Sequence, residues 1–199
     1  MKVLVACEFS GVVRDAFIER GHDAISCDLL PSESEGSHIL GDALEVLDEG
    51  WDLMIAHPPC TYLSRAGARW LYPKGILNNE RYNKLLEGRR FFFALLNADI
   101  PKVAIENPTP FKIAELPPPS QVIQPYEFGE PYSKRTLLWL RGLEPLKPTS
   151  IIDSYSPWLP SNTSGFRKGQ KSTKGKASSS KDYSRTFRGI ANAMASQWG

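Results

Sequence analysis

The stretch from Lys2 to Gly21 reads KVLVACEFSGVVRDAFIERG and decides the fold. Its opening, Lys2–Cys7, is an apolar run with β-branched valines, which predicts a buried strand. A turn at Phe9–Gly11 ends that strand, and Val12–Arg20 then places apolar residues at helical spacing. Gly21 stops the helix, because glycine is favoured just beyond a helix C-terminus. A strand, a turn and a helix in this order predict the repeating unit of an α/β protein.

The same alternation continues along the chain. Short apolar runs that end in polar residues predict further strands, and longer stretches with helical periodicity predict helices between them. The seven prolines of Pro108–Pro131 predict a region that is largely loop. We therefore expect a mostly parallel, doubly wound, Rossmann-like sheet with helices on both faces. The remaining predicted strands are Asp23–Cys27, Asp52–Ala56, Val103–Ile105 and Thr136–Leu140, and the remaining predicted helices are Asp42–Asp48, Asn79–Leu96 and Arg188–Trp198.

The bulk composition is that of an ordinary globular domain. At 199 residues and 41% apolar side chains, the chain can bury one proper core. No apolar run approaches the roughly 20 residues that span a bilayer, and the opening residues lack the features of a signal peptide. The three cysteines are odd in number and widely spaced, so no disulfide framework is predicted. We expect no membrane association and a reducing, cytoplasmic setting.

The C-terminal part of the chain is basic. Between Gly165 and Gly199 there are eight Lys and Arg residues and a single acid, Asp182. Such a segment suits a polyanion such as DNA, although a solvated tail has the same composition. The predicted phosphate contacts are Arg167, Lys168, Lys171 and Lys174. The predicted organisation is a core over residues 1–144, a short basic and irregular segment over 145–187, and a C-terminal helix over 188–199.

Unusual residues gather at the ends of the predicted strands, which is where open α/β sheets bind ligands. Asp28 follows the second strand, and an acid at that place is the usual partner of a pair of ribose hydroxyls. The first turn carries Phe9–Gly11 instead of the G-x-G-x-x-G of dinucleotide-binding proteins. Asp28 is thus a candidate nucleoside contact, and the turn favours a cofactor without a pyrophosphate.

The Pro58-Pro59-Cys60 turn follows the predicted strand Asp52–Ala56. Two prolines stiffen the backbone, so Cys60 is presented at the mouth of the sheet. A thiol in that position is a candidate nucleophile, because a nucleophilic cysteine must be partly exposed and have a stabilised thiolate. The alternative is a buried structural cysteine, and this is the interpretation for Cys7 and Cys27 within their apolar strands.

Taken in order, these motifs resemble those of the DNA cytosine-5 methyltransferase family. Each motif is weak alone, but their order and their placement at strand ends extend over nearly the whole chain. The segments that carry the resemblance are Phe9-Ser10-Gly11, Asp28, Gly41-Asp42, Pro58-Pro59-Cys60, Glu106-Asn107, Ser133-Lys134-Arg135 and Ile190-Ala191-Asn192-Ala193.

The resemblance implies an S-adenosylmethionine-dependent methyltransferase that modifies carbon 5 of cytosine in DNA. Carbon 5 is a weak nucleophile, and addition of a cysteine thiolate at carbon 6 makes it enamine-like and reactive. By resemblance, Cys60 supplies the thiolate, Glu106 hydrogen-bonds N3 and Arg135 contacts the O2 carbonyl. No metal is implied, and a base in a duplex would have to be flipped out. The cofactor contacts that the resemblance implies are Phe9, Ser10, Gly11, Asp28, Asp42, Pro58 and Asn192.

The sequence departs from the family around these groups. His57 stands where glycine is usual before Pro-Pro-Cys, and Thr61 stands where glutamine usually follows. Only Leu140–Gly189 separates the arginine motif from the asparagine motif, where the family carries a long target-recognition region. A compact chain of this kind resembles bacterial or bacteriophage DNA modification enzymes. It implies short or lax sequence specificity, or specificity supplied by another chain.

Competing functions differ in what they require of the sequence. A zinc cytidine deaminase needs a second cysteine at position 63, which is Leu63, so that function is excluded. Action on a free pyrimidine nucleotide stays open, as does transfer of a group other than methyl from an altered S-adenosylmethionine. A non-catalytic nucleic-acid-binding module on the same fold is a third alternative. The strandedness of the nucleic acid and the oligomeric state are not predicted.

Overall fold

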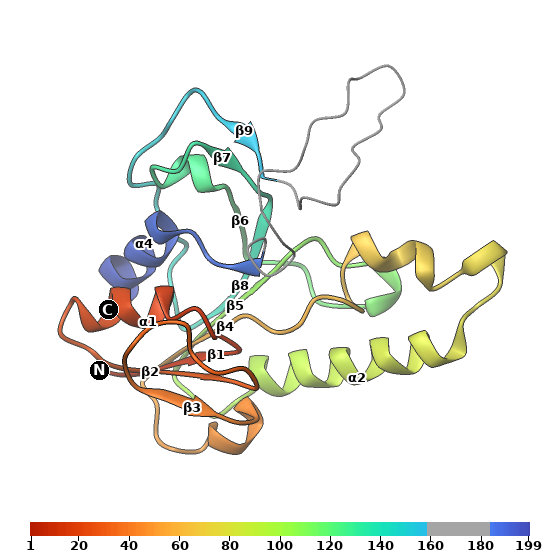
Figure 1. Cartoon of the computed structure of the whole chain (residues 1–199), viewed down its shortest axis with the longest axis horizontal. Helices are drawn as coiled ribbons and strands as arrows, with labels where there is room; N and C mark the ends of the chain where they lie inside the picture. The colour runs from red at the N-terminus through yellow and green to blue at the C-terminus, as the bar shows by residue number, and fades with distance from the viewer. Residues whose placement is uncertain (159–183) are drawn as a thin grey trace.

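Figure 1 shows a computed structural model of the chain, which describes residues 1–158 and 184–199. The predicted phosphate contacts Arg167, Lys168, Lys171 and Lys174 lie outside the described residues. Within the described ranges, no helix has both the length and the apolar character needed to cross a membrane.

One sheet forms the centre of the molecule, and its strands are β1 (Lys2–Ala6), β2 (Asp23–Asp28), β3 (His38–Leu40), β4 (Leu53–Ala56), β5 (Lys102–Asn107), β6 (Gln121–Ile123) and β8 (Thr136–Arg141). Their order across the sheet is β3-β2-β1-β4-β5-β8-β6 (Figure 1). Neighbouring strands from β3 to β5 are parallel, whereas β8 is antiparallel to both β5 and β6. The predicted doubly wound, mostly parallel α/β sheet is therefore confirmed, and its order reverses between β1 and β4.

Helices cover both faces of the sheet, and they are α1 (Val12–Ile18), α2 (Asn79–Leu96) and α4 (Arg188–Trp198). Successive side chains of a strand point to opposite faces. Val3 and Val5 of β1 accordingly pack in one apolar cluster with α1 and α4. Leu4 and Ala6 pack in a second cluster with α2. The central strands are buried on both sides, which is why their sequences are apolar throughout.

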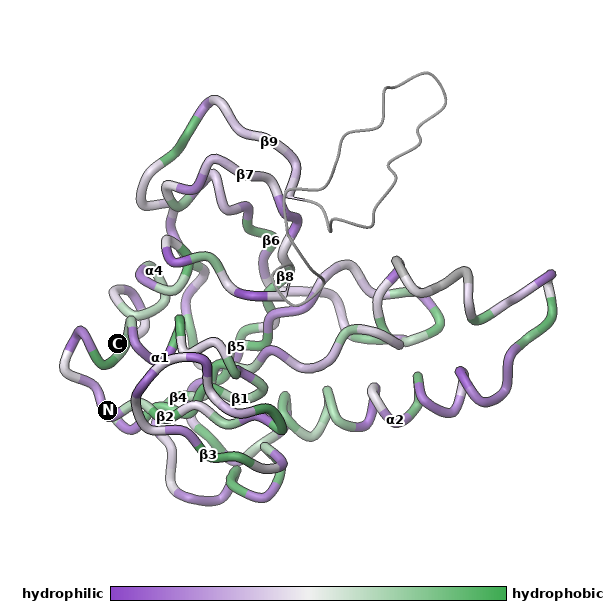
Figure 2. Tube along the Cα trace, viewed as in Figure 1, coloured by the Kyte–Doolittle hydropathy of each residue, from purple (hydrophilic) through white to green (hydrophobic). Residues whose placement is uncertain are grey.

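Only part of α2 covers the sheet. Its buried side chains are Leu85, Phe92 and Leu95. Figure 2 shows hydrophilic residues toward its start and hydrophobic residues toward its end, and in Figure 1 its start extends beyond the strands. Asn78 caps the helix by accepting a hydrogen bond from the Arg81 N–H. The first turns of α2 therefore stand beside the segment that follows Cys60.

Several short elements differ from those predicted from the sequence. The predicted helix Asp42–Asp48 is only a 3-10 turn over Ala43–Val46, which Asp42 caps. Helix α1 ends at Ile18 instead of Arg20. Strand β6 lies in the region predicted as loop, because prolines flank it without interrupting its three residues. The remaining elements are η2 (Arg65–Trp70), η3 (Pro73–Gly75), η4 (Lys112–Ala114), η5 (Pro125–Glu127) and the paired strands β7 (Tyr132–Ser133) and β9 (Ser156–Pro157).

Candidate active site

The ends of β4 and β5 bring His57 and Glu106 together. Ala56 lies opposite Ile105 in this parallel pair, so the next residue of each strand emerges at the same edge. His57 Nδ1 donates a hydrogen bond to Glu106 Oε2 over 3.1 Å, and the side chains are 10% and 12% exposed. Burial raises the pKa of Glu106, but the His57 hydrogen bond and the charge of Lys134 outweigh it and hold that pKa below its ordinary value. Glu106 is therefore a buried carboxylate that is ionised at neutral pH.

The turn that carries Cys60 is held on both sides. Asn107 is buried, and its Nδ2 donates a hydrogen bond to the Pro58 carbonyl over 3.2 Å. After the cysteine, the N–H groups of Leu63 and Ser64 donate to the Cys60 carbonyl over 3.1 and 2.8 Å. Because Asn107 follows Glu106 directly in β5, the same strand end positions both the carboxylate and the cysteine turn.

The Cys60 thiol is half-buried and lies within the field of two opposite charges. Burial is the main cause that raises its pKa, and the Glu106 carboxylate raises it further. Lys134 acts in the other direction and lowers it, without cancelling the rise. Cys60 is consequently a protonated thiol at neutral pH, with a cation available to stabilise its thiolate.

The cation that lowers the pKa values of Cys60 and Glu106 is not the arginine that the resemblance implies. Arg135 is exposed at the start of β8. The preceding residue, Lys134, is half-buried, and its charge affects both Cys60 and Glu106. Lys134 belongs to the same tripeptide motif, but a motif cannot tell which of two adjacent cations faces inward. Arg135 stays a predicted contact to the base, and Lys134 is a site residue that sequence reasoning missed.

A cavity of about 260 Å³ opens at the ends of β1, β2 and β4. Its lining includes three predicted cofactor contacts, Phe9, Ser10 and Asp28. It also includes His57 and Pro59, which places it beside the cysteine turn. Within the described part of the chain, the lining does not include Gly11, Asp42, Pro58 or Asn192.

These four residues have other surroundings. Gly11 adopts a left-handed conformation, with φ 74°, at the tight turn into α1, where a side chain would strain the backbone. Asp42 accepts a hydrogen bond from the Leu44 N–H and caps η1. Pro58 is held through its carbonyl as described above, and Asn192 is exposed on α4. Contact of these side chains with a cofactor therefore stays a prediction.

The first turn of α1 is occupied by a carboxylate. Glu8 is buried, and its Oε1 and Oε2 accept hydrogen bonds from the N–H groups of Val13 and Arg14 over 2.7 and 3.1 Å. Ser10 Oγ also donates to Glu8 Oε1. These are the backbone groups with which a helix N-terminus binds a phosphate. Since Glu8 lines the cavity as well, a phosphate there would meet a negative charge and no free amide of this turn.

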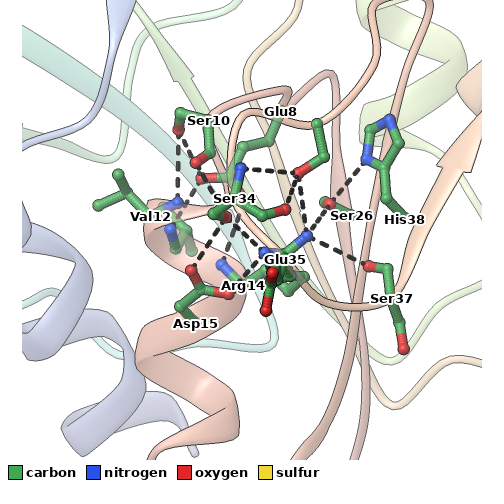
Figure 3. A network of polar contacts seen from close by, with 12 residues as sticks. Glu8, Ser10, Val12, Arg14, Asp15, Ser26, Ser34, Glu35, Ser37 and His38 are labelled. Atoms are coloured by element: carbon green, nitrogen blue, oxygen red, sulfur yellow. Dashed lines mark hydrogen bonds and ion pairs between the residues drawn. The ribbon is translucent and has the colours of Figure 1, made fainter.

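A buried arginine, Arg14, holds the loop that follows β2 through a network of hydrogen bonds (Figure 3). Arg14 is inaccessible to solvent and forms an ion pair with Asp15 over 2.7 Å. Its guanidinium donates to the Ser26 hydroxyl in β2 and to four groups of the loop that follows, which belong to Ser32, Ser34, Glu35 and Ser37. One side chain thus joins α1, β2 and the loop over residues 29–37.

The C-terminal part of the chain returns to this cavity ahead of α4. Ser184, Arg185 and Thr186 line it. Arg185 Nη2 pairs with Glu33 Oε2 over 2.7 Å, which joins this segment to the loop that Arg14 holds. These residues precede Asn192, whose contact with a cofactor stays a prediction. No sequence motif marks them, because their position depends on how α4 packs against α1.

Of the other two cysteines, Cys27 has the environment of a structural residue, whereas Cys7 lies just beyond β1, is partly buried and lines the cavity. Cys27 is buried, burial raises its pKa to about 11, and its Sγ donates to the Gly41 carbonyl. Burial raises the pKa of Cys7 far above its ordinary value. Among the described residues, no group of three His, Cys, Asp or Glu side chains could hold a metal ion. A larger hollow of about 720 Å³ lies along α2. It is open, and its described lining includes neither Cys60 nor Glu106.

Comparison with known proteins finds similarity to solved structures alone. No family model matches the sequence, and no curated protein matches it. Several solved structures match, and among them one of a candidate DNA modification methyltransferase encoded within a prophage of E. coli has a TM-score of 0.48 and 13% identity. The match covers 76% of this chain and 52% of that one, so the chain spans about half the length of that protein. At this similarity the match says nothing about the chemistry of the site.

Proposed function

We propose that this chain transfers a methyl group from S-adenosylmethionine to carbon 5 of cytosine in DNA, with Cys60 as the nucleophile. One observation carries the proposal. Cys60 and Glu106 follow neighbouring parallel strands and interact electrostatically, directly beside a cavity whose wall contains Asp28. A thiol, a carboxylate and a nucleoside-type cavity at one sheet edge are the groups that this reaction requires.

The cavity suits a nucleoside cofactor that lacks phosphate. Asp28 at the end of β2 is placed to accept hydrogen bonds from ribose hydroxyls. Glu8 occupies the first-turn amides of α1, which disfavours a dinucleotide or a nucleoside triphosphate in the same place. S-adenosylmethionine carries a nucleoside without phosphate and supplies an electrophilic methyl group. The residues that would hold it are Phe9, Ser10 and Asp28, together with Thr186, which also lines the cavity.

The site residues would act on the base in sequence. The Cys60 thiol loses its proton to the ionised Glu106 carboxylate and adds to carbon 6, while Lys134 stabilises the negative charge. As the thiolate adds to carbon 6, the protonated Glu106 gives its proton to N3, and carbon 5 becomes the nucleophilic carbon of an enamine. The cofactor would supply the methyl group and leave as the thioether. The carbon 5 proton then leaves to solvent, the Cys60 thiolate is eliminated, the double bond between carbons 5 and 6 re-forms, and N3 returns its proton to Glu106, which passes it back to Cys60. His57 holds the carboxylate in place through its hydrogen bond.

The test is a product assay with defined substrates. The chain is incubated with methyl-labelled S-adenosylmethionine and, separately, with duplex DNA, single-stranded DNA, RNA or free dCMP, and nucleosides are then analysed by mass spectrometry. We expect 5-methylcytosine in DNA. A product in the dCMP reaction alone would favour the pyrimidine-nucleotide alternative. Cofactor binding without transfer to any substrate would favour an altered cofactor or a binding-only role.

The nucleophile is tested separately. A DNA strand with 5-fluorocytosine at the target cannot lose its carbon 5 substituent as a proton, so the adduct with Cys60 should accumulate and survive denaturing electrophoresis. Cys60→Ala should form no adduct and no product while still binding the cofactor. Cys27→Ala, which removes a buried thiol of β2, is the matched control and should keep both. Product formation by Cys60→Ala would contradict the assignment.

A further inference from the structure

Residues 61–78, which we call the flanking segment, join the cysteine turn to α2 and expose a concentration of large apolar side chains. Two leucines, Leu63 and Leu71, are buried and anchor the segment. Large apolar patches are rarely left on a protein surface unless they bind something. Those exposed in this segment are Tyr62, Trp70, Tyr72, Ile76 and Leu77, with exposed fractions from 37% to 73%.

The flanking segment and the first turns of α2 enclose a groove of about 430 Å³. The flanking segment contributes Tyr62, Trp70 and Pro73 to its lining, and the start of α2 contributes the remaining residues. This volume lies in the range of pockets that bind small molecules, so it suits one nucleotide and is too small for a helix or a strand pair. The residues that α2 and its cap contribute are Asn78, Glu80, Arg81 and Lys84.

Charge in the groove is predominantly positive. Arg81 and Lys84 are cationic, and Glu80 is the one acid in the groove lining that the structure describes. Lys84 pairs with Glu87 over 3.0 Å, but both side chains are about half exposed, so that pair contributes little and can exchange for a phosphate. The Arg81 guanidinium lies 4.9 Å from the Tyr62 ring centroid, which puts a cation and an aromatic ring side by side.

A hydrogen bond joins the groove to the turn that carries Cys60. Arg81 Nη2 donates a hydrogen bond to the Thr61 carbonyl over 3.0 Å, one residue after Cys60. The Asn78 N–H donates to the Leu71 carbonyl, which closes the far end of the segment onto the start of α2. The groove therefore has a fixed place beside the reacting residue.

We propose that this groove binds one unpaired nucleotide adjacent to the target cytosine, with its base against Trp70 and Tyr62 and its phosphate at Arg81 and Lys84. Aromatic rings combined with cations along a groove are the features of single-strand binding surfaces. Stacking on a side chain needs a free base face, which neighbouring pairs cover in a duplex. The proposal rests on the proposed function, and it makes single-stranded or locally opened DNA the preferred substrate.

The experiment measures binding of a fluorescently labelled 12-nucleotide DNA strand with a central cytosine, against the same strand in a duplex and its RNA counterpart. We expect Trp70→Ala to weaken single-strand binding about tenfold, because stacking of one base on one ring has that order of effect. Trp70→Phe should restore most of it. The matched control is Tyr155→Ala, which removes another exposed aromatic ring and should change binding less than twofold.

The phosphate contact has its own readout. Lys84→Ala should lower the slope of log Kd against log salt by about 0.7, the contribution of one phosphate contact on a single strand. Lys147→Ala, in which an exposed lysine with only backbone hydrogen bonds is lost, should leave that slope unchanged. Both lysines are exposed, so these variants keep the fold even if a Trp70 variant does not.

Two outcomes would overturn the proposal. One is that Trp70→Ala and Lys84→Ala both bind every strand as the wild type does. The other is that Trp70→Ala abolishes self-association in light scattering and leaves DNA binding intact, which would make the groove a contact between copies of the chain. Trp70-dependent binding with no modified cytosine would keep the groove and reject the proposed function. Normal methylation kinetics together with the first of these outcomes would reject the groove and keep the function.

Discussion

Four ionisable side chains near the ends of β4, β5 and β7 lie together in a partly buried site, and they are His57, Cys60, Glu106 and Lys134. Glu106 is ionised although it is buried, because His57 donates to it and Lys134 is close enough to affect it. The same carboxylate raises the pKa of the Cys60 thiol, and the same lysine lowers it. At the scale of the residue, the protonation state of the proposed nucleophile is therefore set by burial and by its charged neighbours.

Exchange of Lys134 for glutamine tests that dependence. Without its positive charge the pKa of Cys60 should rise further, so kcat/KM at pH 7 should fall and the alkaline rise of the pH–rate profile should move to higher pH. Arg135→Gln, the neighbouring control, should raise KM for DNA without moving the profile. The measurement is kcat/KM from pH 6 to pH 10. If Arg135→Gln moves the profile and Lys134→Gln does not, the catalytic cation is Arg135.

His57→Ala should lower the free energy of unfolding at pH 7 by about 2 kcal/mol, because it removes a hydrogen bond to a buried charge. The lowered pKa of Glu106 stabilises the fold above the ordinary carboxyl value of about 4.3, and this contribution is lost as pH falls through the lower folded value. Urea denaturation should thus show the wild type and His57→Ala converging as the pH falls below the ordinary carboxyl value of about 4.3.

Two variants make this measurement specific. His57→Asn keeps a donor near the Nδ1 position and should recover part of the lost stability. Arg89→Ala breaks the exposed pair of Arg89 with Glu115 and should cost less than about 1 kcal/mol at any pH. An equal loss at pH 3 and pH 7 in His57→Ala would mean that packing of the ring, and not the charge of Glu106, is responsible.

At the scale of elements, the first turn of α1 does two tasks, one with its backbone and one with its side chains. Its backbone N–H groups bind the Glu8 carboxylate, and the side chains of Arg14 and Asp15 hold the loop over residues 29–37. That loop carries Leu30 of the cavity wall and Glu33, the partner of Arg185. The shape of the cavity thus depends on one buried guanidinium far from the reacting atoms.

Arg14→Lys should therefore destabilise the protein by about 3 kcal/mol or more, because an ammonium cannot reach all the groups that the guanidinium satisfies. It should also weaken S-adenosylmethionine binding in calorimetry, since the loop loses its support. Arg188→Lys, in the exposed pair with Glu19, is the matched control and should do neither. If Arg14→Lys is destabilised but binds the cofactor normally, the Arg14 hydrogen bonds stabilise the fold without shaping the cavity.

The sequence predicted the elements that have their own periodicity and missed those that depend on neighbours. The strand–turn–helix pattern of Lys2–Ile18 needs only local information, and so do the polar residues at the strand ends. The three-residue strands β3 and β6 are too short to show alternation, and they exist because β2 and β8 offer free edges. Lys134 and Thr186 reach the site through long-range packing, which no local pattern encodes.

At the scale of the whole molecule, the two ends of the chain form one layer. Helix α4 packs against α1 and buries Ile190, Met194 and Trp198 on that face of the sheet (Figure 1). Trp198 Nε1 also donates to the Glu144 carbonyl over 2.9 Å. The packing of β1 and α1 and the position of the cavity-lining residues Ser184–Thr186 thus depend on the same helix.

Trp198→Ala should lower the free energy of unfolding by about 3–5 kcal/mol, because it leaves a large cavity in the core between α1 and α4. Ser196→Ala, on the exposed side of the same helix, is the control and should change stability by less than about 1 kcal/mol. Guanidinium denaturation measures both. A loss below 1 kcal/mol in Trp198→Ala would show that α4 is not part of the cooperative core.

The pairing of α1 with α4 also has a consequence for synthesis on the ribosome. Val13, Ala16 and Phe17 are complete within the first tenth of translation, but the helix that shields them is translated last. From Phe17 to Trp198 the ribosome adds 181 residues, which takes roughly 10–40 s. During that interval Val13, Ala16 and Phe17 can pack against β1 and β2 but lack the apolar cover that α4 supplies. We expect the yield of the chain in the cell to depend on chaperone capacity and on the speed of elongation.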